Sequence, residues 1–216
     1  MSWRRRATGS SPPICLALDV LSRSRAPYTV NYFEDDARAF AALLQHLAVG
    51  PAHLIGFSDG GEDALLMAAL LPNAVRSVVT WGAAGLLSDP SGQLREAMYN
   101  LVDQPIPPLK GFRDYLVGAY GESNARAMSQ SMVTALSAIM ESRGGDLSLS
   151  KAGSIVCPVL LITGEHDMFV PMALISQFAA RAGAAETVEA KGAGHDVHNA
   201  LPEWTAQTVL DWLKQH

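Results

Sequence analysis

Ser58 stands in the segment Gly-Phe-Ser-Asp-Gly-Gly, residues 56–61, directly after a short apolar run. A serine on a sharp turn between a strand and a helix can act as a nucleophile, because the turn holds its side chain clear of the backbone. The backbone angles of such a turn require small neighbours, which Gly56 and Gly60 supply. Glycine-rich turns between a strand and a helix also bind phosphate, so this segment alone leaves both interpretations open.

Two segments further along the chain favour the nucleophile. Asp167 follows the apolar run 158–163, past the C-terminal end of a predicted buried strand, where α/β sheets place their chemistry. His195 ends a Gly-Ala-Gly-His loop after a strand-like stretch at 186–190, so its ring can turn towards the serine. We therefore predict a catalytic triad with Ser58 as nucleophile, His195 as general base and Asp167 as the group that orients the histidine. Glu165 is the reserve candidate for the acid.

The order serine, aspartate, histidine is that of the α/β-hydrolases, and the three motifs together resemble that superfamily. Residues 56–61, 77–83, 163–171 and 194–198 look more narrowly like its valacyclovir hydrolase (biphenyl hydrolase-like) branch. The resemblance runs from about Cys15 to the C-terminus. It implies an α/β-hydrolase fold: a mostly parallel sheet with helices on both faces and a small helical cap. It also implies a serine hydrolase that cleaves small carboxylic esters, amino-acid esters among them, through an acyl-serine intermediate.

Asp59 follows the nucleophile and has two predicted roles. Its backbone N–H would be one donor of the oxyanion hole, since it opens a helix whose positive end faces Ser58. Its carboxylate would bind a cationic group on the substrate, such as the ammonium of an amino-acid ester. The alternative is a carboxylate that only stabilises the helix N-terminus. Trp81, at the end of the next predicted strand, is a second candidate for contacting substrate.

Composition restricts the partners of the chain. With 216 residues, 49% of them hydrophobic and 17% charged, the sequence predicts a single soluble domain with a full core. A net charge of −5 gives no electrostatic basis for binding nucleic acid or a membrane surface. Cys15 and Cys157 both fall in predicted strands, which favours buried thiols and a cytoplasmic location. The glycine spacing of a dinucleotide site is absent, and His195, Asp196 and His198 lack a further ligand at suitable spacing, so we expect no cofactor and no metal.

Strand and helix patterns alternate along the chain and predict a parallel sheet. Strands are expected at 14–19, 52–57 and 75–81, and a last helix at 201–214. An earlier helix should begin at Asn31, with Glu34 completing a capping pattern. The residues expected to be buried on these two helices are Phe33, Ala37, Phe40, Leu44 and Leu47 on the first, and Ala206, Val209, Leu210 and Leu213 on the last.

The predicted organisation has three parts. Residues 1–13 form an Arg-rich tail. We expect this tail to be disordered, or to be present because the start of the chain was mis-assigned. Residues 14–85 and 151–216 form the α/β core. Residues 86–150 lose the strand signal and carry four of the eight methionines, which predicts a helical cap whose methionines line an adaptable pocket or fill gaps beneath the helices.

The sequence departs from the family near its N-terminus. Family members normally begin with a strand and a His-Gly-x-x-Gly-type loop that supplies a second oxyanion donor, and no such segment precedes the strand at 14–19. One lost donor costs about 10²–10³ in rate. A catalytically weak or inactive paralogue that binds a small ligand or a partner is therefore the first alternative. A cofactor-free perhydrolase or C–C hydrolase with the same triad is the second. Open strand edges would also favour self-association, so a homo-oligomer is predicted.

Overall fold

The computed structural model describes residues 28–183 and 185–216. The predicted tail at 1–13 and the predicted strand at 14–19 lie outside the described residues, and so does Cys15. Within the described part of the chain, no helix is long and apolar enough to cross a membrane.

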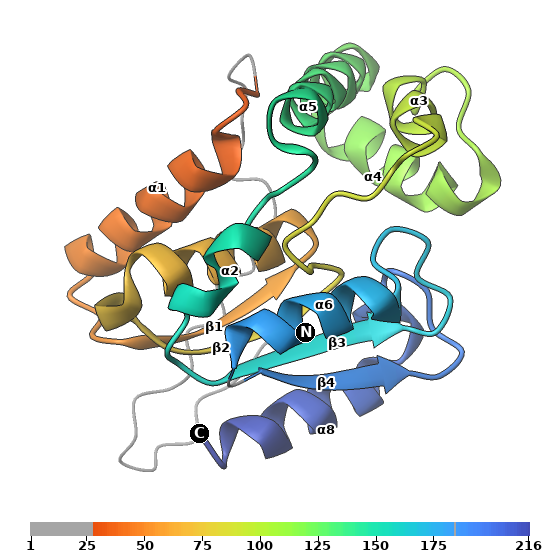
Figure 1. Ribbon diagram of the computed structural model, residues 1–216. Coiled ribbons are helices and arrows are strands. Elements are labelled where there is room, and N and C mark those ends of the chain that lie inside the picture. The colour runs from red at the N-terminus through yellow and green to blue at the C-terminus, as the bar shows by residue number, and fades with distance from the viewer. Residues whose placement is uncertain (1–27, 184) are drawn as a thin grey trace.

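A four-stranded sheet organises the fold, with all its strands parallel and in the order β1-β2-β3-β4 (Figure 1). The strands are β1 (Ala52–Phe57), β2 (Val75–Trp81), β3 (Val159–Gly164) and β4 (Ala185–Ala190). The register pairs Phe57 with Trp81, Trp81 with Ile162, and Gly164 with Ala190. The four strands therefore end at one edge of the sheet, and the loops that follow them meet there.

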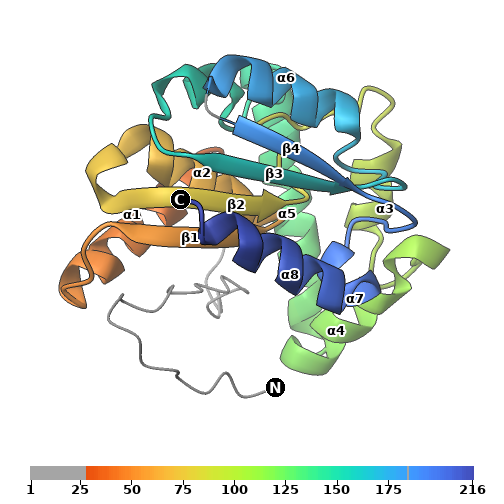
Figure 2. The ribbon, with the colours of Figure 1, turned by 90° about the horizontal axis from the view of Figure 1, so that it is seen from below.

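Helices cover both faces of the sheet (Figure 2). Three of them, α1 (Tyr32–His46), α2 (Asp59–Leu70) and α6 (Met172–Ala182), share one apolar core with Val78 and Leu161 of the sheet. The other face packs against α8 (Pro202–Leu213) through Val79 and Leu160. Neighbouring strand residues point to opposite faces of the sheet. Because helices cover both faces, β3 is buried along its whole length.

The cap lies between β2 and β3 in the chain and consists of α3 (Gln93–Tyr99), α4 (Lys110–Tyr120) and α5 (Glu122–Arg143). Figure 1 shows these helices grouped beyond the C-terminal ends of the strands. They have a small apolar core of their own, in which Met98, Leu101 and Leu116 are buried and against which Phe169 of the main domain packs. Shorter helical turns complete the chain: η1 (Pro72–Ala74), η2 (Pro107–Leu109), η3 (Leu149–Ser154) and α7 (Val197–Ala200).

The expected α/β class is confirmed, and β1 and β2 have the predicted bounds. Three details of the helices were predicted wrongly. Asn31 precedes α1 but makes no side-chain cap bond, and Glu34 accepts a hydrogen bond from Arg143 of the cap. Leu47 lies past the end of α1 and is 55% exposed. On α8, Leu210 is exposed and Trp212 is buried in its place.

Candidate active site

Ser58 occupies a strained turn between β1 and α2. It has φ 53° and ψ −122°, so a non-glycine residue adopts a positive φ. The backbone holds this conformation through the Ser58 N–H, which donates to the Trp81 carbonyl at 2.9 Å, and through the Ser58 carbonyl, which accepts from the Gly61 and Glu62 N–H groups. Gly56 has no room for a side chain, since a Cβ there would overlap the backbone of Gly60. The glycine predicted at position 56 is therefore sterically required.

His195 lies between Ser58 and Asp167 and contacts both. Its Nε2 atom is 3.1 Å from the Ser58 Oγ, and its Nδ1 atom is 2.9 Å from the Asp167 Oδ2. An ionised carboxylate only accepts hydrogen bonds, so we assign the ring proton to Nδ1. The unprotonated Nε2 then faces the serine hydroxyl, which is the arrangement that general-base activation of a serine requires.

Asp167 is 6% exposed and is held by backbone donors. Its Oδ1 accepts from the Phe169 N–H at 2.8 Å and the Val170 N–H at 3.0 Å. These two bonds fix the carboxylate, and both of its oxygens face the His195 Nδ1, with Oδ1 at 3.1 Å and Oδ2 at 2.9 Å. Glu165, the reserve candidate, points elsewhere: it accepts from the Gly192 N–H at 2.9 Å, and this bond lowers the pKa of its carboxyl.

Close packing fixes the ring of His195 on several sides. The rings of Phe57 and Phe169 lie 5.0 and 4.7 Å from it, centroid to centroid. Gly82, with φ +68°, closes another side, because a Cβ at that position would lie 2.6 Å from the His195 Cε1. The sequence motifs gave no indication of this contact, which a positive-φ glycine directly after β2 makes possible.

Trp81 and His198 form a pair beside the triad. The Trp81 Nε1–H donates to the His198 Nδ1 at 3.0 Å, and both rings lie against Phe57. Desolvation by burial lowers the pKa of His198, which favours the neutral ring that accepts this bond. The polar atom of Trp81 is thus engaged, so only its ring surface could contact a substrate. In the sequence, His198 belongs to the 194–198 motif and is a candidate metal ligand, and neither feature indicates the bond to Trp81.

Asp59 begins α2 next to Ser58. Its N–H is the first of the helix and has no acceptor within it, so it is available to a developing oxyanion. Asp59 is exposed to solvent, although its carboxyl oxygen lies 3.4 Å from the buried Tyr32 hydroxyl, which donates to it. Desolvation by the surrounding protein raises the pKa of this carboxyl, while the Tyr32 hydroxyl and the proximity of His195 act in the opposite direction. The carboxylate therefore combines access for a ligand with a fixed hydrogen-bond partner.

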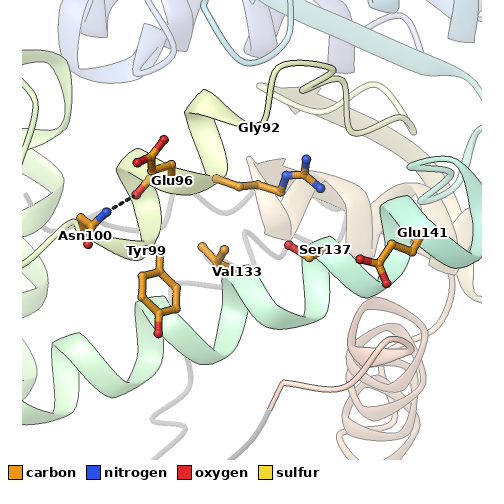
Figure 3. A pocket seen from close by; sticks show the side chains of 8 residues that line it. Gly92, Glu96, Tyr99, Asn100, Val133, Ser137 and Glu141 are labelled. Atoms are coloured by element: carbon orange, nitrogen blue, oxygen red, sulfur yellow. Dashed lines mark hydrogen bonds between the residues drawn. The ribbon is translucent and has the colours of Figure 1, made fainter.

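A separate hollow of about 380 Å³ lies between α3 and α5 of the cap (Figure 3). Tyr99 and Asn100 line it on one side, and Ser137 and Glu141 of α5 on the other. Arg95 also lines the hollow, but its guanidinium is already paired with the buried carboxylate of Asp89 at 3.1 Å. None of the triad residues lines this hollow, so the arrangement of Ser58, Asp167 and His195 and not the volume of the hollow defines the candidate site.

Comparison with known proteins is consistent with this geometry. The chain is 26% identical over 147 residues to "Serine hydrolase BPHL" of Mus musculus, covering 65% of this chain and 47% of that protein. It is 26% identical over 204 residues to "2-(acetamidomethylene)succinate hydrolase" of Mesorhizobium japonicum, covering 86% and 71%. The chain thus spans about half the length of the serine hydrolase relatives that it matches.

Solved structures share the fold. An esterase from Exiguobacterium antarcticum superposes with a TM-score of 0.65 at 20% identity, covering 88% of this chain and 76% of the esterase. The profile of the "Alpha/beta hydrolase family" matches residues 3–208. These matches confirm the resemblance drawn from the motifs, and the chain belongs to the alpha/beta hydrolase family.

Proposed function

We propose that this protein is a serine hydrolase that cleaves small carboxylic esters through an acyl-serine intermediate. The observation that carries the proposal is the continuous chain of contacts Ser58–His195–Asp167, with 3.1 and 2.9 Å between the bonded atoms. Serine is weakly nucleophilic at its ordinary pKa and needs an adjacent, oriented base. All three parts of that device lie within one site, on a family fold that carries hydrolases.

The reaction follows from the roles of the three groups. Ser58 Oγ attacks the ester carbonyl carbon while His195 Nε2 takes its proton, and the Asp59 N–H stabilises the oxyanion. His195 then gives that proton to the leaving alcohol as the acyl-serine forms. In the second half, His195 deprotonates a water molecule, which attacks the acyl carbon. His195 then returns that proton to the Ser58 Oγ as the bond from the acyl carbon to Oγ breaks, which releases the acid and restores the free serine. Asp167 keeps the ring in the required tautomer throughout.

Covalent labelling with a fluorophosphonate tests the proposal, since that reagent reacts with an activated serine. The wild-type chain should be labelled rapidly, and Ser58→Ala and His195→Ala should abolish the reaction. His166→Ala is the matched control, because His166 neighbours the acid and its side chain is exposed. Absence of labelling in a folded wild-type protein would refute the proposal and favour the ligand-binding alternative.

For the substrate, we propose that Asp59 favours esters with a cationic group near the scissile bond. Asp59 is an exposed residue adjacent to Ser58, and its carboxylate accepts a hydrogen bond from Tyr32. The ratio of kcat/KM for a cationic ester over its neutral analogue should fall in Asp59→Asn. It should also fall in the wild type as salt is raised, because exposed charges are screened within about 10 Å at 0.1 M. A ratio that neither change alters would remove Asp59 from substrate binding.

A further inference from the structure

Two chain segments, which we call the neck, join the cap to the main domain. The outgoing segment (residues 82–87) leads from β2 into the cap, and the returning segment (residues 145–149) leads from α5 back to the main domain. The Gly85 carbonyl accepts from the N–H groups of Leu147, Ser148 and Leu149 at 2.9 to 3.0 Å. The Leu87 N–H donates to the Gly145 carbonyl at 2.8 Å. The two segments are thus bonded to each other at the point where the cap begins.

A single carboxylate from the main domain also binds both segments. Glu62 is 4% exposed and lies on α2, four residues after the nucleophile. Its Oε1 accepts from the Ala84 N–H at 2.9 Å and the Gly85 N–H at 2.7 Å, which belong to the outgoing segment. Its Oε2 accepts from the Ser148 hydroxyl at 2.8 Å, in the returning segment.

The outgoing segment also touches the catalytic base. Gly82 is two residues before Ala84, and its Cα lies against the His195 ring so closely that a Cβ would overlap it. At the other end, the Glu62 N–H donates to the Ser58 carbonyl at 3.1 Å. Glu62 therefore has its backbone in the nucleophile turn and its side chain on the segment that packs against His195.

The buried carboxylate of Glu62 supplies hydrogen-bond acceptors to the neck in addition to filling space. A buried charge is costly unless its acceptor sites are filled, and here three donors fill them. An apolar residue of similar size would fill the same volume but would leave two buried backbone N–H groups without an acceptor. The geometry points to Glu62 as a positioning residue for the hydrolysis proposed above: its carboxylate fixes the neck of the cap and, through residues 82–85, the segment that holds the His195 ring.

The test compares Glu62→Gln with Glu62→Leu. Glutamine can retain all three bonds, because its carbonyl oxygen accepts from both backbone N–H groups and its amide donates to the Ser148 hydroxyl, which can accept. Leucine retains none. Glu96→Leu on α3 is the matched control, since Glu96 is exposed.

Two measurements are made on each variant: hydrogen exchange at the Ala84 and Gly85 amides, and the rate of fluorophosphonate labelling at Ser58. We expect Glu62→Leu to speed exchange at those amides by at least tenfold, and to slow labelling by at least tenfold, while the Leu161 amide of β3 keeps its protection. A tenfold change in the opening equilibrium corresponds to about 1.4 kcal/mol. Glu62→Gln and Glu96→Leu should stay within a few-fold of the wild type in both measurements.

If Glu62→Leu does not fold, Ser148→Ala replaces it, with faster exchange expected at residues 147–149 and slower labelling. The inference would be overturned if Glu62→Leu kept the amide exchange rates and the labelling rate of the wild type. It would also be overturned if Glu62→Gln lost as much labelling rate as Glu62→Leu. The exchange measurement does not depend on activity. A wild type that is not labelled would refute the proposed function, while exchange at Ala84 and Gly85 would still show whether Glu62 holds the neck.

Discussion

Replacing Asp167 by asparagine should inactivate the protein without unfolding it, because two backbone hydrogen bonds decide which way the new amide group is oriented. The Oδ1 of Asp167 accepts from the Phe169 and Val170 N–H groups, so the asparagine oxygen must take that position. The asparagine NH₂ group then replaces Oδ2, 2.9 Å from the His195 Nδ1. The amide oxygen would lie 3.1 Å from the Nδ1 but already accepts from two backbone N–H groups, whereas the nearer NH₂ group can only donate. We therefore expect the Nδ1 to accept and the ring proton to move to Nε2. A protonated Nε2 cannot take the proton of Ser58.

The expected loss is that of a triad with the wrong tautomer, a factor of about 10⁴ in kcat, or about 5 kcal/mol on the barrier. Initial rates on a small activated ester measure it, with Ser58→Ala as the background. Asp196→Asn is the matched control, because Asp196 neighbours His195 and is exposed. The thermal midpoint should change little, since the variant keeps the size of the side chain and both backbone bonds. An Asp167→Asn rate within tenfold of the wild type would refute the tautomer argument.

Two further predictions concern the packing around the site. Gly82→Ala should reduce activity strongly in a folded protein, because the new Cβ would lie 2.6 Å from the His195 Cε1 at a φ of +68° that alanine disfavours; Gly111→Ala, where nothing lies within 4 Å, should leave the rate unchanged. Arg143→Met should lower the free energy of unfolding by about 1.5–3 kcal/mol near neutral pH, because the buried Glu34 loses its 2.7 Å charged hydrogen bond. Burial alone would raise the pKa of Glu34, but the Arg143 hydrogen bond, a backbone hydrogen bond and the charges of Arg143 and Lys151 together outweigh it, and the pKa is lowered. That stabilisation is present above the unfolded-state pKa of about 4.3 and is lost as the pH falls below it, so urea titrations should show the two proteins converging in acid; a constant difference would contradict this.

The sequence predicted the parts of the fold that local patterns control. The bounds of β1 and β2 followed from apolar runs that end at turn residues, and the positions of Ser58, Asp167 and His195 followed from motifs at strand ends. In a parallel sheet these ends share one edge, so residues more than a hundred positions apart could be expected to meet. The distances within the triad depend on register and loop packing, which no local pattern specifies.

Contacts between the cap and the main domain were the part that the sequence did not reveal. Glu34 looked like half of a capping box, because a glutamate three residues after asparagine is the usual sign of one. It instead pairs with Arg143, more than a hundred residues away, at the end of α5. This charged bond joins α1 to the end of α5, and no spacing rule in the sequence could have indicated the partner.

The three acidic residues that follow Ser58 also have environments that their spacing in the sequence does not reveal. Glu62 and Asp63 follow Asp59 by three and four residues, so helical spacing places both on the side of α2 that carries Asp59 and does not distinguish them. Their environments separate them: Asp59 is exposed, whereas Glu62 and Asp63 are 4% and 5% exposed. Asp59 is the exposed one of the three, and Glu62 accepts from backbone donors of the neck of the cap. Negative charge near Ser58 also opposes the developing oxyanion, so a carboxylate here is useful where a substrate cation or protein donors compensate it. Asp59 meets the first condition in our proposal and Glu62 meets the second.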